Sequence, residues 1–201
     1  MVHASARILK HWRTIGSCLA IALCAVYVTK SLALGAKESQ PQLATVASST
    51  SDASPIFGIT IPPGYRDWKL IAVDQLVTGK TNQLRAQLGN EIAIKAYKEG
   101  TLPFPDGAII AGVHWTRVPS EDNRKVLAVE FPDAQSFVIG SAVNVQFMVK
   151  DSKKYAATGG WGFADFKNGK SADEAALKTC FPCHVPAKGS DYVFAKYAPT
   201  P

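Results

Sequence analysis

Five residues near the C-terminus of this 201-residue chain, Cys180-Phe181-Pro182-Cys183-His184, constrain its structure more than any other stretch. The spacing Cys-x-x-Cys-His is typical of an attachment site for c-type haem. Two thiols three residues apart can form thioether bonds with the vinyl groups on one porphyrin edge, and the histidine that follows is then held at the iron as an axial ligand. The motif therefore predicts one covalently attached haem c, with Cys180 and Cys183 as attachment points and His184 as the iron ligand.

Two other kinds of site use the same residue types. A thiol–disulfide site shares the Cys-x-x-Cys spacing, but it normally follows an early strand and opens the first helix of a βαβ unit, whereas this motif comes late in the chain. A structural zinc site needs four ligands. Outside the N-terminal segment the chain offers only Cys180, Cys183, His114 and His184, and the adjacent Cys183 and His184 would have to share one metal. Haem attachment is the better interpretation.

The second axial position of the haem can be narrowed by counting residues. After the N-terminal segment the chain contains one methionine, Met148, and one histidine besides His184, which is His114. A six-coordinate electron carrier would need one of these two as its second axial ligand. Both fall within predicted strands, where a thioether or a lone histidine is commonly a packing residue. We therefore expect an open sixth position.

The first 36 residues have the pattern of an export signal. Arg7, Lys10 and Arg13 precede an apolar run, Ile15–Val28, and small residues follow it. The run is shorter than the roughly 20 residues that span a bilayer, and its length is typical of a signal-peptide core. We predict that residues 1–36 are a cleavable signal peptide and that the mature protein is periplasmic. The alternative is an uncleaved membrane anchor.

Composition then divides the rest of the chain. Residues 37–55 are rich in Ser, Thr, Ala, Gln and Pro, which predicts a flexible linker. Residues 56–201 form the predicted haem domain, whose length suffices for a single core. The formal net charge of +6 comes mainly from four basic residues before residue 37, and the remainder holds 18 basic against 16 acidic residues. With no basic cluster in this part, nucleic-acid binding is not expected.

The haem domain combines short strands with a few short helices, so we predict a mainly β fold, with α+β as the alternative. In the segment Ser141–Lys150, Val145 and Phe147 share one face, while Gln146 and Met148 share the other. The predicted strands are Tyr65–Val77, with Trp68, Leu70, Ala72 and Leu76 in its apolar pattern, Ala108–Val118, Lys125–Phe131, Ser141–Lys150 and Trp161–Phe166.

Two helices carry terminal signals. Glu91–Glu99 suits a short helix that Gly100 ends. Ser171-Ala172-Asp173-Glu174 matches the capping-box pattern, with Ser171 as the N-cap of a helix that continues to Lys178. We expect the haem motif to lie at the end of this second helix.

The chain resembles the cytochrome P460 family. The resemblance covers nearly all of the chain after residue 56, and the order and spacing of its segments make it specific. It rests on Gly64-Tyr65-Arg66-Asp67-Trp68, Ala96-Tyr97-Lys98-Glu99-Gly100, Phe104-Pro105-Asp106-Gly107, the segment from Met148 to Tyr155, Gly160-Trp161-Gly162-Phe163, and the segment from Cys180 to Tyr197.

This resemblance implies a mostly antiparallel β fold and a five-coordinate haem with His184 as its axial ligand. Family members include hydroxylamine-oxidising enzymes and non-catalytic cytochromes c′-β, which bind nitric oxide and other small gases. The resemblance is also compatible with a homodimer and with a periplasmic electron-transfer partner.

Two departures from the enzymes of the family bear on activity. Those enzymes cross-link a lysine to the porphyrin from the strand after the Asp-Gly motif, but here Ala108–Trp115 contains no lysine. They also place a glutamate as distal proton acceptor just before the segment that begins at Met148. The corresponding residue here is Gln146, whose amide cannot take up a proton at neutral pH. Gln146 and Phe147 are the candidate residues of the distal pocket.

These observations lead to three expectations for function. The first is a haem protein that binds or detoxifies a small nitrogen-containing ligand such as nitric oxide. The second is an oxidoreductase acting on hydroxylamine or nitric oxide, and the third is a periplasmic electron-transfer cytochrome. The missing lysine and the amide of Gln146 favour the first.

Overall fold

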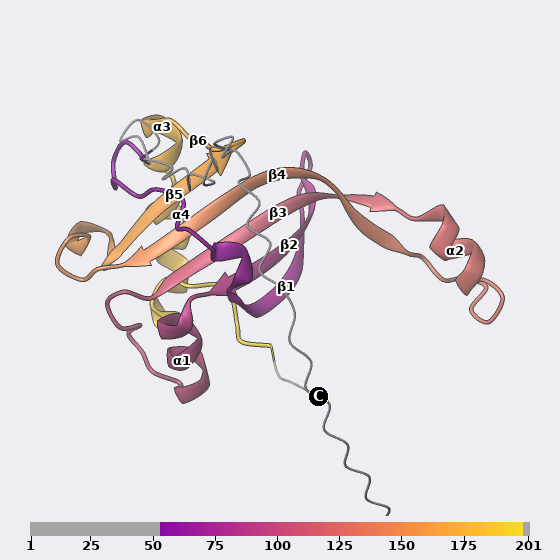
Figure 1. The fold of residues 1–201 in the computed structure, drawn as a ribbon, viewed down its shortest axis with the longest axis horizontal. Coiled ribbons are helices and arrows are strands. Elements are labelled where there is room, and N and C mark those ends of the chain that lie inside the picture. Colours follow the sequence, from indigo (N-terminus) through magenta and orange to yellow (C-terminus); the bar gives the residue numbers. More distant parts are fainter. Residues whose placement is uncertain (1–52, 199–201) are drawn as a thin grey trace, which may run out of the picture. The chain divides into compact units, whose positions relative to one another are not determined.

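A single antiparallel sheet of six strands, in the order β1-β2-β3-β4-β5-β6, forms the framework (Figure 1). The computed structural model describes residues 53–198, so the predicted signal peptide and most of the predicted linker lie outside the described residues. The strands are β1 (Lys69–Val77), β2 (Asn82–Gly89), β3 (Ile109–Pro119), β4 (Phe137–Lys150), β5 (Trp161–Lys167) and β6 (Lys170–Ser171). This confirms the predicted mainly β, antiparallel fold with a few short helices.

The helices are short: α1 and α2 connect strands, and two further helices follow the last strand. They are α1 (Glu91–Glu99), α2 (Glu121–Leu127), α3 (Glu174–Leu177) and α4 (Cys180–His184), with single 3₁₀ turns at Tyr65–Asp67 and Ala156–Thr158 and a longer 3₁₀ segment, Val185–Ser190. Within residues 53–198, no helix has both the length and the apolar character needed to cross a bilayer.

Helix α1 has the bounds that the sequence predicted. The side chain of Asn90 accepts a hydrogen bond from the amide of Ala93, which caps the first turn. Gly100 ends the helix in the left-handed conformation, at φ 64°. The helix buries Ala93, Ile94 and Ala96 in the core.

Strand β1 is shorter than predicted, and its apolar face differs. The chain forms a 3₁₀ turn at Tyr65–Asp67 and enters the strand only at Lys69. A register shift against β2 lies between Leu70 and Ala72, so Ile71 is the extra residue of a bulge. Ile71 is fully buried and Leu70 is 51% exposed, the reverse of the alternation that we expected. The bulge moves the side chains before it to the other face.

The predicted strand Lys125–Phe131 is wrong. Residues Glu121–Leu127 form α2 instead, and turns follow it. Ser120 caps the helix through its hydroxyl, and Arg124 pairs with Glu121 one turn away, so local contacts favour the helix. β3 and β4 extend past their other neighbours as a two-stranded arm that ends at this helix (Figure 1).

The predicted capping box before the haem motif is also wrong. Ser171 closes the short strand β6, and Asp173 is the N-cap of α3, where its carboxylate accepts from the amide of Ala176 at 2.8 Å. Helix α3 ends at Leu177, whose side chain is buried. The haem motif then forms a separate helix, α4, rather than the end of the preceding one.

Candidate haem site

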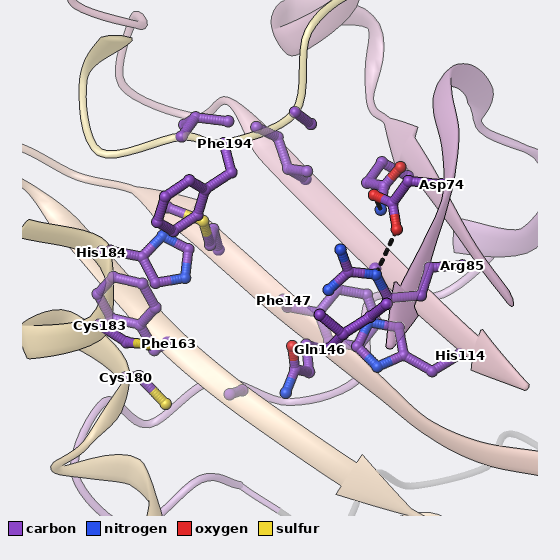
Figure 2. A pocket seen from close by; sticks show the side chains of 18 of the residues that line it. Asp74, Arg85, His114, Gln146, Phe147, Phe163, Cys180, Cys183, His184 and Phe194 are labelled. Atoms are coloured by element: carbon purple, nitrogen blue, oxygen red, sulfur yellow. Dashed lines mark hydrogen bonds and ion pairs between the residues drawn. The ribbon is translucent and has the colours of Figure 1, made fainter. Parts of the chain in front are cut away.

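One face of the sheet and helix α4 enclose a cavity of about 670 Å³ (Figure 2). Cys180, Cys183 and His184 line one wall, together with the segment Val193–Ala195. The sheet supplies the opposite wall, which includes Asp74, Leu76, Arg85, Gln87, Ile110, Gly112, His114, Gln146 and Met148, while Phe163 of β5 lies beside His184. The volume lies within the range of about 300–1,000 Å³ that is usual for cofactor sites.

The imidazole of His184 is held in one tautomer. Its Nδ1 lies 2.7 Å from the backbone oxygen of Tyr192, and because a carbonyl only accepts hydrogen bonds, Nδ1 carries the hydrogen. The ring lies between Phe163 and Phe194, with both centroid distances at 5.1 Å. Burial lowers the pKa of His184, although the hydrogen bond to Tyr192 opposes that shift. The neutral ring keeps the lone pair of Nε2 available, which is the form that binds a metal.

A buried ion pair fixes the backbone that accepts this hydrogen bond. Asp191 and Tyr192 both adopt positive φ angles, 53° and 65°, which are unfavourable for such residues. The carboxylate of Asp191 receives Nζ of Lys150 at 2.8 and 2.9 Å and the amide of Phe104 at 2.8 Å. The ring of Tyr192 packs where a side chain at Gly159 would lie. The position of the Tyr192 carbonyl therefore depends on β4 and on the turn before β5.

The two thiols lie on the same wall as His184. Both are free, Cys180 half-buried and Cys183 exposed. Burial, with a smaller contribution from Asp165, raises the pKa of the Cys180 thiol. A redox-active Cys-x-x-Cys site depends on a lowered thiol pKa, and the sheet of residues 53–198 contains only antiparallel pairs instead of a βαβ unit. Both findings speak against the thiol–disulfide alternative.

The zinc alternative is not supported either. Among the residues that the structure describes, no group of three or more His, Cys, Asp or Glu side chains is placed to hold a metal ion. His114 lies on β3, in the sheet wall, while Cys180, Cys183 and His184 lie on α4. Figure 2 shows these residues on opposite sides of the cavity.

The sheet wall carries polar side chains from β1, β2, β4 and β5. Asp74 and Arg85 form an ion pair at 2.5 Å, and Gln87 Nε2 donates to the same carboxylate at 2.8 Å. On the other side of the wall, Asp165 receives Nδ2 of Asn144 at 2.8 and 2.9 Å and Nε2 of Gln146 at 3.0 Å. The two carboxylates thus bind most of the amide donors of the wall.

The two predicted distal residues lie next to each other on β4 but face opposite sides of the sheet. Gln146 points into the cavity and is exposed. Phe147 borders the cavity, but its ring is 1% exposed and packs against Tyr65 and Phe166 in the core. The NH₂ group of Gln146 donates to Asp165 at 3.0 Å, which leaves its carbonyl oxygen for the cavity.

His114 and Met148 both line the cavity rather than pointing away from it. Met148 is 9% exposed and pairs in register with Ile110 on β3 and Phe163 on β5. His114 is 7% exposed, and burial together with the nearby Arg85 lowers its pKa, while Asp165 and Asp74 act in the opposite direction. That both are packing residues, and that neither binds the iron, stay predictions.

Sequence reasoning missed part of the sheet wall. It assigned no element to residues 82–88, so Arg85 and Gln87 of β2 had no place in the predicted site, and Asp74 and Asp165 were not singled out. The signal was weak, because β2 reads Asn-Gln-Leu-Arg-Ala-Gln-Leu-Gly, with few residues of high strand propensity. Its polar side chains become informative only once β1 and β3 bring their partners alongside.

Thiols and a neutral imidazole line one wall of a cofactor-sized cavity, and apolar side chains line much of the remainder, an arrangement that suits a haem. The family model for cytochrome P460 matches residues 62–195, which is more than half of the chain. The chain therefore belongs to the cytochrome P460 family and is a haem protein. No curated protein matches it.

Proposed function

We propose that this protein is an exported mono-haem c-type cytochrome that binds or detoxifies a small nitrogen-containing ligand such as nitric oxide. Cys180 and Cys183 would carry the haem through thioether bonds, and His184 would bind its iron. When bound, a five-coordinate haem supplies an open iron position for a small ligand. The observation that carries the proposal is the placement of both thiols and the fixed imidazole of His184 on one wall of a single cavity.

The composition of the cavity supports ligand binding over hydroxylamine oxidation. Among the described residues that line it, none is a lysine that could link to a porphyrin. Lys150 is buried and its ammonium group pairs with Asp191 outside the lining. Gln146 offers an amide oxygen, which does not accept a proton at neutral pH. The enzymatic alternative therefore lacks the two groups on which the resemblance to the oxidising enzymes would depend.

Electron transfer is a second candidate, because His114 and Met148 both line the cavity. An optical spectrum of the purified protein separates the two functions. We expect a high-spin ferrous spectrum at the usual position of five-coordinate c-type haem. A low-spin spectrum that changes in His114→Phe or Met148→Leu would replace the proposal with electron transfer, and a strongly red-shifted Soret band would favour the hydroxylamine-oxidising class.

Covalent attachment and export have direct tests. Mass spectrometry of tryptic peptides should find haem on the peptide that contains Cys180 and Cys183 and on no second peptide. Haem bridged to a lysine-containing peptide would overturn this part of the proposal. N-terminal sequencing of the exported protein should begin near Lys37, whereas an intact N-terminus in the membrane fraction would favour the anchor.

A further inference from the structure

The carbonyl group that His184 contacts belongs to a turn with two consecutive left-handed residues, neither of them glycine. The φ angles are 53° at Asp191 and 65° at Tyr192. A side chain with a Cβ makes this conformation unfavourable, so it persists only where the surrounding structure enforces it, and such residues gather at functional sites. We therefore looked for the contacts that hold this turn.

The side chain of Asp191 is fixed to parts of the chain that are far apart in the sequence. Its carboxylate receives Nζ of Lys150 at 2.8 and 2.9 Å and the backbone amide of Phe104 at 2.8 Å. Nζ of Lys150 also donates to the carbonyl of Gly159 at 3.2 Å. Lys150 is the last residue of β4, and its own amide is bonded to the carbonyl of Ala108 at 2.9 Å. The turn at Asp191 is thus anchored to the end of the sheet.

Stability alone does not require two charges at this place. Both side chains are less than 10% exposed, and apolar residues of similar volume often stabilise a protein as well as a buried ion pair does. An ion pair differs from an apolar contact because its hydrogen bonds are directional and fix the position of both groups. The charges at Lys150 and Asp191 are therefore better explained by the backbone position that they define.

The backbone position matters for His184. Its Nδ1–H donates to the Tyr192 carbonyl at 2.7 Å, which is shorter than the usual value of about 2.9–3.0 Å for such a bond. A hydrogen bond at one ring nitrogen raises the basicity of the other, and hydrogen bonding around an axial ligand is one means by which a protein sets the reduction potential of a haem. A more basic imidazole favours Fe(III) over Fe(II), because the ion of higher charge gains more from a stronger donor.

We propose that Lys150 and Asp191 are positioning residues that lower the reduction potential of the haem iron through the Tyr192 carbonyl and His184. The inference rests on the proposed function, in which His184 binds the iron, and adds how the chain sets the balance between the two oxidation states. Both residues lie outside the lining of the cavity. They act on the iron ligand without contact to the bound group.

Two double variants separate this role from a purely structural one. Lys150→Met/Asp191→Gly and Lys150→Met/Asp191→Asn each remove one positive and one negative charge, so the net charge stays the same. Glycine adopts the left-handed conformation but has no side chain to anchor the turn. Asparagine also tolerates this conformation, and its Oδ1 is an acceptor for the amide of Phe104. The asparagine variant therefore keeps part of the anchor that the glycine variant loses.

Redox titration of the purified holoprotein with dithionite and ferricyanide follows the one-electron Fe(III)/Fe(II) couple. In Lys150→Met/Asp191→Gly the equilibrium should shift about threefold to tenfold toward Fe(II), the usual worth of one hydrogen bond, which raises the potential by about 30 to 60 mV. Lys150→Met/Asp191→Asn should give a smaller shift, about twofold, because one contact of the anchor remains. Resonance Raman spectra of the ferrous proteins should show the iron–imidazole stretching frequency falling in the same order.

Glu174→Gln/Lys178→Met is the control. It removes an exposed ion pair, at 2.6 Å, shortly before the haem motif and likewise leaves the net charge unchanged. Its potential should equal that of the unmodified protein. An unchanged potential in both test variants, with haem attached, would overturn the inference. If the glycine variant does not fold, the asparagine variant decides by the same criterion. An unmodified protein that carries no haem, or whose ferrous haem is six-coordinate and low-spin, would instead refute the proposed function.

Discussion

One wall of the cavity comes from α4 and the segment Val193–Ala195, and the other comes from side chains of several strands, beginning with Asp74 on β1. Helix spacing alone places Cys180, Cys183 and His184 near one another, whatever surrounds them. The sheet wall has no such local rule, because a slip of one residue in register would turn each of its side chains to the other face. The two walls should therefore respond differently to substitution.

The two walls also differ in the polarity of their side chains and in the contacts that hold these side chains in place. The helix wall presents two thiols and a neutral imidazole. The imidazole of His184 is oriented by the carbonyl of Tyr192, whose position depends on the neighbouring Lys150–Asp191 pair. The sheet wall contains the Asp74–Arg85 ion pair and the carboxylate of Asp165, and its amides are oriented by Asp74 and Asp165. The helix wall is suited to hold a cofactor, whereas the sheet wall presents polar side chains to the cavity.

Removing both thiols should have the largest effect. In Cys180→Ala/Cys183→Ala we expect no covalently bound haem and a marked loss of stability, because a ligand that binds only the folded state stabilises it by mass action. Acid–acetone extraction followed by mass spectrometry of the protein measures attachment, and thermal unfolding measures stability. Stoichiometric covalent haem in the double variant would refute the assignment of this wall.

Breaking the Lys150–Asp191 pair, which holds the helix wall in place, should have the second largest effect. Lys150→Met leaves the carboxylate of Asp191 buried without its counter-charge, since both side chains are less than 10% exposed. Removal of one partner from a buried pair costs about 3–5 kcal/mol. Denaturant unfolding should show this loss, and the optical spectrum should change because the Tyr192 carbonyl can shift away from His184. Lys95→Met removes a lysine from an exposed pair with Glu99 and should change stability by less than about 1 kcal/mol.

A carboxylate placed in the sheet wall should have a smaller, pH-dependent effect. Gln146→Glu replaces a donor to Asp165 with a second acid at about the same position. Two adjacent carboxylates resist ionising together, so the pKa of one is raised. A pKa that is higher in the folded protein favours folding at low pH, so the variant should lose about 1–2 kcal/mol at pH 7 and regain it as the pH falls toward about 4. Stability that does not depend on pH would contradict this arrangement.

The smallest effect concerns His114. Burial and Arg85 lower its pKa in the folded protein, while Asp165 and Asp74 oppose that shift. The unfolded chain therefore takes up a proton first as the pH falls through about 6.5, and the folded state loses stability below that value. His114→Gln should flatten the dependence of unfolding free energy on pH between about 7 and 5. An unchanged slope would show that the imidazole is not buried in this way.

The sequence by itself determined the haem motif, helix α1 with its glycine end, and the approximate bounds of β3, β4 and β5. Each of these depends on contacts within a few residues, such as thiol spacing, a helix cap or strand alternation. Local signals failed at β1, where the bulge at Ile71 reversed the faces, and at Ser171, where Asp173 caps the helix instead.

Only the tertiary structure decided the composition of the sheet wall. Asp74, Arg85 and Gln87 lie on two strands, and nothing in their local sequence shows that they share a face with Gln146 and Asp165 from strands far along the chain. The structure also decided how the amides of Gln87 and Gln146 are oriented, because each NH₂ group donates to a carboxylate from another strand. Long-range register, which no short segment encodes, therefore sets the chemistry opposite His184.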